Sequence, residues 1–203
     1  INDGNGIDVA KPPEHDLWIP EMIFGHLRTS TNYDKDEKKI VGGKNGFGFK
    51  LVLIWSEWGS VETVDHNRKL KYTQNFRDNL TVIEDPVITK VSGKPYTKVV
   101  FKPDYKRFGV PNGLSKNMVE LLNRRIYDIA AVTDKKVIVR HNGTANGIKT
   151  FQQYIDLYIG GKDKTARVYE EGSERWEYCV CISPFDEFTQ ESFENDIYTG
   201  KGG

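Results

Sequence analysis

The chain has 203 residues, which is enough for one large domain or for one domain and part of a second. Its 29 basic and 29 acidic residues give a net charge of zero, which argues against binding to nucleic acids or membranes through bulk charge. Hydrophobic residues make up 37% of the chain and no apolar run approaches the roughly 18 residues of a membrane span, so we expect a globular protein without membrane association.

Two short helices are predicted in the first third of the chain. Residues 19–27 carry apolar side chains at helical spacing, and a proline occupies the first turn, where its missing N–H costs nothing. Polar and charged residues over 29–43 predict a loop, and a glycine-rich segment follows over 42–50. The apolar run 51–55 is most typical of a buried helix. The apolar side chains that share one face of the first helix are Ile19, Ile23 and Leu27.

The middle of the chain is rich in predicted strands and ends in a long helix. Partial alternation of apolar and polar residues over 61–64, 70–76 and 96–101 predicts three strands. Ser115 can cap a helix that continues to about Val132. The apolar side chains that recur at helical spacing in it are Met118, Leu122, Ile126 and Ile129.

A hairpin and another helix are expected next. Residues 137–140 predict a strand, and the pair Asn142 and Gly143 is typical of a tight hairpin turn. Residues 150–159 predict a helix. The side chains expected to point inward from it are Phe151, Tyr154, Ile155 and Tyr158.

The last part of the chain predicts a linker over residues 160–164 and then two strands, over 166–169 and 175–182. Cys179 and Cys181 would share one face of the second strand, too far apart for an easy disulfide, which favours a reduced intracellular setting. The alternating apolar side chains of that strand are Trp176, Tyr178, Val180 and Ile182. Mixed helices and neighbouring strands favour an α+β architecture over a doubly wound parallel sheet.

Three polar or glycine-rich segments near the start could form a nucleotide site. In residues 2–6, Asn-Asp-Gly-Asn-Gly, alternate glycines let the backbone approach a flat ligand, and the amide or carboxylate beside them can read a base edge. The segment 29–33 carries hydroxyl and amide groups that could bind ribose or phosphate. An ordinary turn and a solvated helix end are the alternatives for these two segments.

The third segment, residues 42–50, exposes closely spaced backbone N–H groups and precedes a helix, which makes it a candidate anion cradle. Lys44 and Lys50 add positive charge. It is not a Walker A loop, because Phe49 stands where the lysine belongs, and it also lacks the last glycine of the dinucleotide fingerprint. A flexible surface loop is the alternative, but the three segments together predict a nucleotide site.

Several segments in a fixed order resemble the ATPase region of type IIA DNA topoisomerases, and the eukaryotic-like branch, which includes enzymes of large DNA viruses, is the most similar. The resemblance spans the whole chain. The segments that carry it are residues 2–7 (Asn-Asp-Gly-x-Gly-Ile), 19–34, 36–39, 42–51, 124–130 and 199–203.

This resemblance implies an α/β sandwich of the GHKL (Bergerat) type over residues 1–159, lacking its N-terminal part, and the truncated beginning of a transducer domain over residues 160–203. It also implies that ATP, with Mg²⁺, closes a lid over the nucleotide, joins two ATPase domains into a homodimeric gate and drives the passage of one DNA segment through another.

The resemblance also implies roles for individual residues. Asn2 would read the adenine edge, and Gly4 and Gly6 would let the base approach. The residues expected to contact ribose and phosphates are Ser30, Thr31 and Asn32. The lid over the triphosphate would consist of Lys44, Asn45, Gly46, Phe47 and Gly48. Lys50 would pair with phosphate oxygens.

Other parts expected from the family fall outside this chain. The glutamate that acts as general base and the asparagine that holds Mg²⁺ would precede Ile1, and the transducer lysine and the DNA-cleaving tyrosine would follow Gly203. We therefore expect this fragment alone to hydrolyse ATP negligibly, and no catalytic or metal-binding residue is assigned within it. Phe49 stands where a small residue is more usual, which leaves the packing behind the lid open.

Two alternatives keep the nucleotide but change the task. One is another GHKL protein, such as a mismatch-repair ATPase, a sensor kinase or a ninety-kilodalton chaperone, although these resemble the chain only in short motifs. The other is a nucleotide-dependent dimerisation module without chemistry. A topoisomerase of a eukaryotic cell would be located in the nucleus, and that of a cytoplasmic DNA virus in the viral factory.

Overall fold

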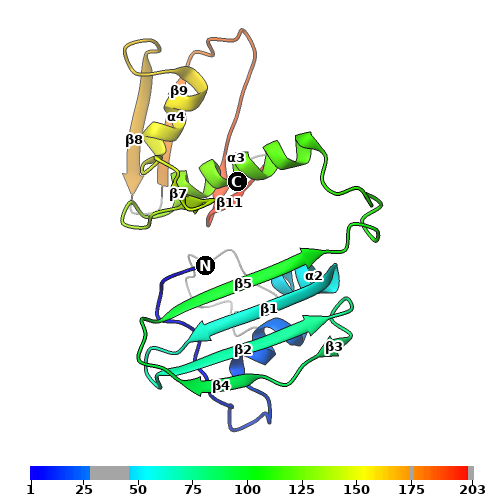
Figure 1. The fold of residues 1–203 in the computed structure, drawn as a ribbon. Helices are drawn as coiled ribbons and strands as arrows, with labels where there is room; N and C mark the ends of the chain where they lie inside the picture. The colour runs from blue at the N-terminus through cyan, green and yellow to red at the C-terminus, as the bar shows by residue number, and fades with distance from the viewer. Residues whose placement is uncertain (28–45, 174–175, 201–203) are drawn as a thin grey trace. The chain divides into compact units, whose positions relative to one another are not determined.

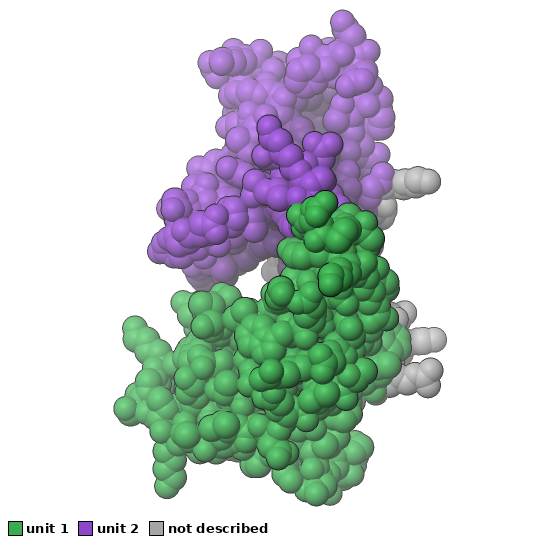
Figure 2. Space-filling model, turned by 45° about the vertical axis from the view of Figure 1, so that its right-hand side comes forward, with its two compact units in different colours: residues 1–39, 43–113 green, residues 40–42, 114–203 purple. Residues whose placement is uncertain are grey.

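The computed structural model describes residues 1–27, 46–173 and 176–200, which belong to two compact units. The first unit contains residues 1–27 and 46–113 of the described chain, and the second contains the described residues from 114 onward (Figure 2). This division falls after Gly113, whereas the resemblance places a domain boundary after Ile159. A compact unit and a family domain are defined differently, so the boundary at Ile159 stays a prediction.

An antiparallel sheet of five strands forms the first unit (Figure 1). Its order is β3-β2-β1-β5, and β4 also pairs with β2. The strands predicted from alternation are present, and Val61 in the central strand lies opposite both Gln74 and Val99. The strands are β1 Ser56–Val64, β2 Leu70–Arg77, β3 Val82–Ile83, β4 Val87–Lys90 and β5 Tyr96–Pro103.

Two short helices, α1 Ile19–Gly25 and α2 Gly48–Ile54, lie on the same face of this sheet (Figure 1). The core between helices and sheet is formed by Phe24, Leu53, Val61 and Phe76, each buried and each worth about 1.5–3 kcal/mol by transfer from water. Gly59 of β1 permits this approach, because a Cβ there would overlap the side chain of Leu53.

The first predicted helix is present, but the face that it buries differs from the face expected from its apolar spacing. Pro20 and Phe24 are buried, whereas Ile23 and Leu27 are exposed. The aromatic ring of Phe24 fills the space over the sheet and meets the ring of Phe49 edge-on at 4.9 Å between centroids. Phe49 therefore has a packing role at the position where a small residue was expected.

The second unit is built around two helices, α3 Lys116–Val132 and α4 Phe151–Ile159, which pack on each other. The predicted cap is confirmed, since the Ser115 hydroxyl accepts a hydrogen bond from the Met118 amide at 3.2 Å. Thr150 caps α4 in the same way. The predicted apolar repeat of α3 is largely exposed instead of buried, at Met118, Leu122 and Ile129.

Three two-stranded hairpins complete the second unit, and one confirms the predicted tight turn. Asn142 and Gly143, with φ of 50° and 80°, connect β6 Arg140–His141 to β7 Thr144–Ala145. The strand predicted over residues 137–140 is wrong except for its last residue, because β6 begins at Arg140. The other hairpins pair β8 Arg167–Ser173 with β9 Trp176–Cys181 and β10 Phe193–Glu194 with β11 Ile197–Tyr198.

The alternation over residues 176–182 correctly predicts a strand, but its apolar face is open. Trp176 is 70% exposed and Val180 is 63% exposed, while Cys179 and Cys181 occupy the opposite, partly covered face as free thiols. Taken together, the described chain mixes helices with antiparallel sheets, as predicted for the α+β class.

Candidate nucleotide-binding site

The predicted base-reading residue, Asn2, is attached to the edge of the sheet in the first unit. Its backbone forms a two-way pair with Thr97 of β5, with both N–H···O distances at 2.8 Å. The side-chain oxygen of Asn2 accepts a hydrogen bond from the Gly4 amide at 2.9 Å. This bond uses one of the two lone pairs of the oxygen, so the Asn2 side chain can offer a base both its NH₂ donor and a second lone pair as acceptor.

Gly4 and Gly6 shape the turn that follows, and both have a reason to be glycine within the chain itself. Gly6 has φ of +75°, and a Cβ at this position would overlap the carbonyl oxygen of Val64. A Cβ on Gly4 would lie 2.8 Å from the Asn2 side-chain oxygen. The structure thus brings Asn2, Gly4 and Gly6 together in one tight turn against the sheet.

A buried threonine that the sequence analysis did not single out lies beneath this turn. Thr63 of β1 has no exposed surface, and its Oγ1 accepts a hydrogen bond from the Ile7 amide at 2.9 Å. The same oxygen lies 3.0 Å from the Tyr96 carbonyl oxygen and 3.0 Å from Thr97 Oγ1. Thr63 therefore joins the end of the glycine turn to the strand that carries the partner of Asn2.

A buried carboxylate, also missed, holds the next residues. Asp65 is 1% exposed and accepts hydrogen bonds from the backbone amides of Val9, Asn67 and Arg68 at 2.7–3.0 Å, and from the Arg68 guanidinium at 3.0 Å. Burial raises the pKa of Asp65, but the hydrogen bonds from Arg68, Val9 and Asn67 outweigh it and lower the pKa to about 2. One sequence signal could have indicated this role: Asp65 comes directly after a strand, and Asn67 and Arg68 follow within three residues.

Part of the predicted phosphate-binding set lies outside the described residues. These are Ser30, Thr31 and Asn32 of the hydroxyl segment, and Lys44 and Asn45 of the lid. The described remainder of the lid leads into α2, with Gly46 at φ of +66° and Phe47 37% exposed before the helix. Gly48 begins α2, and a Cβ there would meet no atom within 4 Å. Packing within the chain therefore does not require a glycine at this position. The open space beside Gly48 leaves room for a ligand to approach.

Lys50, predicted to pair with phosphate, is 2% exposed and lies within the first turn of α2. Its Nζ donates a hydrogen bond to the Gly46 carbonyl oxygen at 2.8 Å. Burial lowers the pKa of Lys50. In this arrangement the ammonium group holds the end of the lid segment against the helix, and its pairing with phosphate stays a prediction.

The glycine turn and the start of α2 rest on the same core. Ile7, which follows Gly6, and Phe49, which follows Gly48, both pack against the cluster formed by Phe24, Leu53, Val61 and Phe76. The two predicted nucleotide-binding segments are therefore positioned by one set of buried side chains.

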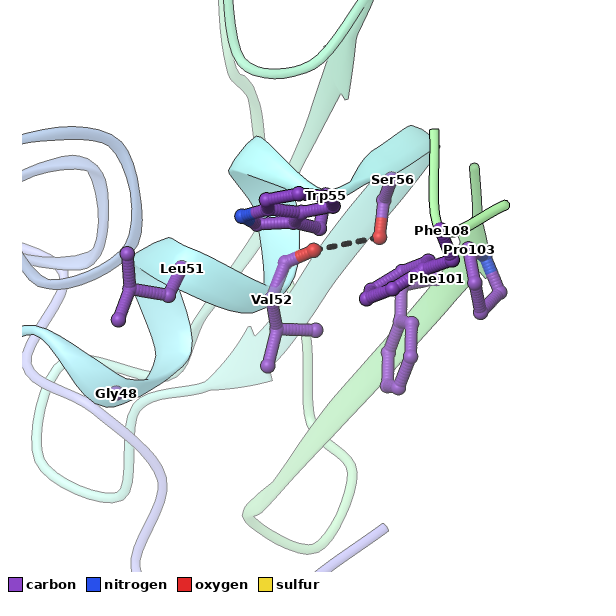
Figure 3. A pocket seen from close by; sticks show the side chains of 8 residues that line it. All are labelled: Gly48, Leu51, Val52, Trp55, Ser56, Phe101, Pro103 and Phe108. Carbon is purple, nitrogen blue, oxygen red and sulfur yellow. Dashed lines mark hydrogen bonds between the residues drawn. The ribbon is translucent and has the colours of Figure 1, made fainter. Parts of the chain in front are cut away.

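An apolar hollow of about 300 Å³ lies beside α2, with Gly48 in its lining, and extends to β5 (Figure 3). The only side-chain hydroxyl in its lining, that of Ser56, donates to the Val52 carbonyl oxygen at 2.6 Å. The hollow has no charged group and therefore lacks what a triphosphate needs. Its lining consists of Gly48, Leu51, Val52, Trp55, Ser56, Phe101, Pro103 and Phe108.

The described residues contain neither a metal-binding cluster nor a membrane-spanning helix. No three or more His, Cys, Asp or Glu side chains in this part of the chain are grouped so that they could hold a metal ion. None of the helices described there has the length and apolar character needed to cross a membrane.

Comparison with known proteins identifies relatives over the full length of the chain, although no family model matches. DNA topoisomerase 2 of Arabidopsis thaliana is 43% identical over 209 residues, and that of Acanthamoeba polyphaga mimivirus is 41% identical over 205 residues. Both alignments include the whole of this chain but only 14% and 16% of these relatives.

Solved structures agree with the sequence relatives. The ATPase region of Saccharomyces cerevisiae topoisomerase II matches 98% of this chain with a TM-score of 0.90 and 41% identity, and this chain covers 52% of it. The ATPase and transducer domains of DNA topoisomerase II from Balamuthia mandrillaris match 97% of the chain, which covers 50% of them, with a TM-score of 0.87 and 39% identity. The chain is homologous to the ATPase region of type II DNA topoisomerases, and its α+β architecture is the GHKL fold of that region.

Proposed function

We propose that this homologue of the topoisomerase II ATPase region is part of the ATP-operated gate of a type II DNA topoisomerase, an ATP-hydrolysing isomerase. The observation that carries the proposal is the match to the yeast ATPase region over nearly the whole chain, at a TM-score of 0.90 and 41% identity. The described glycine turn and the glycine-led start of α2 support nucleotide binding, because they occupy the two positions at which the resemblance puts the base and the phosphates.

The nucleotide we propose is ATP, with its base at Asn2, Gly4 and Gly6. The amino group of adenine needs an acceptor, and the Asn2 oxygen, which accepts one hydrogen bond from Gly4, has a second lone pair to offer. The exposed carboxylate of the neighbouring residue, Asp3, is an acceptor that could complete the reading of the base edge. The proposed contacts to ribose and phosphates come from Ser30, Thr31, Asn32, Lys44, Asn45, Gly46, Phe47, Gly48 and Lys50.

Two carboxylates near the turn, Asp65 and Asp8, are poorly suited to activate water. A general base works best with a pKa near the working pH, whereas that of Asp65 is lowered to about 2 and its oxygens are occupied. Asp8 is ion-paired with Arg68 at 3.3 Å. The base and the ligands of Mg²⁺ would then come from other parts of the protein, with the triphosphate supplying oxygens for the ion.

We further propose that two copies join through this region when ATP binds, and that the complete enzyme acts on DNA, in the nucleus or in the factory of a cytoplasmic DNA virus. A dimerisation module without chemistry is the second candidate. Nucleotide-dependent dimerisation without turnover at natural length would support the second candidate.

The test is the ATPase rate of the protein that carries this chain, at its natural length, with and without supercoiled plasmid. Turnover that rises on adding the plasmid would support the topoisomerase proposal. Turnover indifferent to DNA would contradict it and would indicate another ATPase with the same fold.

A further inference from the structure

The hydroxyl of Thr63 has a partner for each of its three hydrogen-bonding sites. One Oγ1 atom contacts the Ile7 amide, the Tyr96 carbonyl oxygen and Thr97 Oγ1, all at 2.9–3.0 Å. These partners come from the glycine turn and from β5, two segments that are far apart in the chain. No other hydroxyl in the described residues is placed between the turn and the strand in this way.

The hydrogens of this cluster can be assigned by counting donors. A hydroxyl has one hydrogen to donate and two lone pairs to accept with, and the Ile7 N–H takes one lone pair of Thr63. The Tyr96 carbonyl cannot donate, so the Thr63 hydrogen points to it. All three contacts are satisfied together only if the Thr97 hydroxyl donates to Thr63. Thr97, which is partly exposed, then has only lone pairs left for other partners.

Thr97 is also the residue whose backbone holds Asn2, so its lone pairs lie in the part of the sheet where the base is proposed to bind. A lone pair there favours a base that presents an amino group, as adenine does, over one that presents a carbonyl oxygen, as guanine does. At the same time, the bond from Ile7 fixes the end of the glycine turn to β1.

We propose that Thr63 is a positioning residue for nucleotide selectivity, which holds the glycine turn in place and orients the Thr97 hydroxyl as an acceptor. This inference rests on the proposed ATP site. Thr63 itself is buried and touches no ligand.

The test uses the protein at its natural length and compares Thr63→Val, which keeps the shape but removes the hydroxyl, with Thr63→Ser, which restores it. Ser56→Ala is the matched control, because Ser56 is also buried in β1 but its hydroxyl donates to the Val52 carbonyl oxygen, away from the glycine turn. Calorimetric titration measures affinity for three probes: a non-hydrolysable ATP analogue, the matching GTP analogue and inorganic tripolyphosphate. Hydrogen exchange of residues 2–9 reports the turn without any ligand.

For Thr63→Val we expect the affinity for the ATP analogue to fall about fivefold or more, with tripolyphosphate changed less than about twofold, as the loss of several hydrogen bonds predicts. The preference for ATP over GTP analogue should fall, amide exchange around Ile7 should accelerate, and Thr63→Ser should restore both. Ser56→Ala should lower the melting temperature without changing the preference.

Thr97→Val separates the two roles and remains informative if Thr63→Val does not fold. It removes the acceptor but keeps the bond from Ile7 to Thr63, so the preference for the ATP analogue should fall while exchange near Ile7 stays unchanged. An equal loss of affinity for all three probes, or an unchanged preference in both variants, would overturn the inference. If the wild-type protein binds none of the probes, both the proposed function and this inference fail. If amide exchange near Ile7 is unchanged in Thr63→Val, only the positioning role of Thr63 is contradicted.

Discussion

Replacing Gly6 by alanine should destabilise the first unit strongly, although the residue is only partly buried. The alanine would need φ of +75°, a left-handed conformation that costs a residue with a Cβ about 1–2 kcal/mol. Its Cβ would also overlap the Val64 carbonyl oxygen, which belongs to the paired backbone of β1 and cannot rotate away. Relief of such an overlap costs about 1–3 kcal/mol, so the expected loss in the free energy of unfolding is roughly 2–5 kcal/mol.

Gly48→Ala is the matched control, because a Cβ at Gly48 meets nothing within 4 Å and the position lies in helix α2. We expect a stability that is unchanged or higher by up to about 1 kcal/mol. If Gly48 is part of the lid, the same variant should bind ATP more weakly, since the added methyl group occupies the space left for the phosphates.

The assay is urea unfolding followed by tryptophan fluorescence, which reports chiefly on the first unit because it contains three of the four tryptophans, Trp18, Trp55 and Trp58. The reasoning would be refuted if Gly6→Ala unfolded at the same urea concentration as the wild type. It would equally be refuted if Gly48→Ala proved as destabilising as Gly6→Ala, since the two sites would then not differ in the way the structure shows.

Three further predictions concern buried charge, the second unit and catalysis. Folding lowers the pKa of Asp65 from 3.8 to about 2, which adds about 2 kcal/mol to the free energy of unfolding. This contribution is complete above pH 3.8 and is lost as the pH falls through about 2. Unfolding measured across this acid range should show the loss in the wild type and not in Asp65→Asn. Tyr154→Phe removes the hydrogen bonds to Asp128 (2.7 Å) and Tyr158 (2.9 Å). It should lower the free energy of unfolding by about 1–2 kcal/mol, measured by calorimetry, without changing nucleotide affinity. An unchanged unfolding enthalpy and melting temperature would count against it. The purified 203-residue chain should show negligible magnesium-dependent ATP turnover in a coupled assay, and robust turnover would disprove the absence of a working base.

Local signals in the sequence predicted most of the elements because each depends on neighbouring residues. The Ser115 cap, the turn at Asn142 and Gly143 and the Thr150 helix are all confirmed, since a cap or a tight turn is decided within four residues. The glycines of residues 2–6 could be recognised as a tight turn for the same reason.

The supporting residues of the candidate site could not be predicted in this way. Thr63 and Asp65 accept hydrogen bonds from the amides of Ile7 and Val9, in each case 56 residues earlier in the chain, and only the folded chain brings these partners together. The burial of Lys50, whose Nζ donates to the Gly46 carbonyl oxygen, likewise depends on how the chain packs around α2, which its spacing in the glycine-rich run does not reveal.

The faces of the helices and strands show where periodicity stops being informative. Alternation over residues 176–182 correctly places Trp176 and Val180 on one side of β9, yet that side is open and the cysteines occupy the covered one. In α3 the repeat through Met118 and Leu122 is likewise exposed, while Asp128 is buried because Arg125 and Tyr154 satisfy its two oxygens. Periodicity states which side chains share a face, but a face becomes core only if another element packs against it. A buried carboxylate with partners on two helices is therefore a better marker of where α3 and α4 meet than the apolar repeat itself.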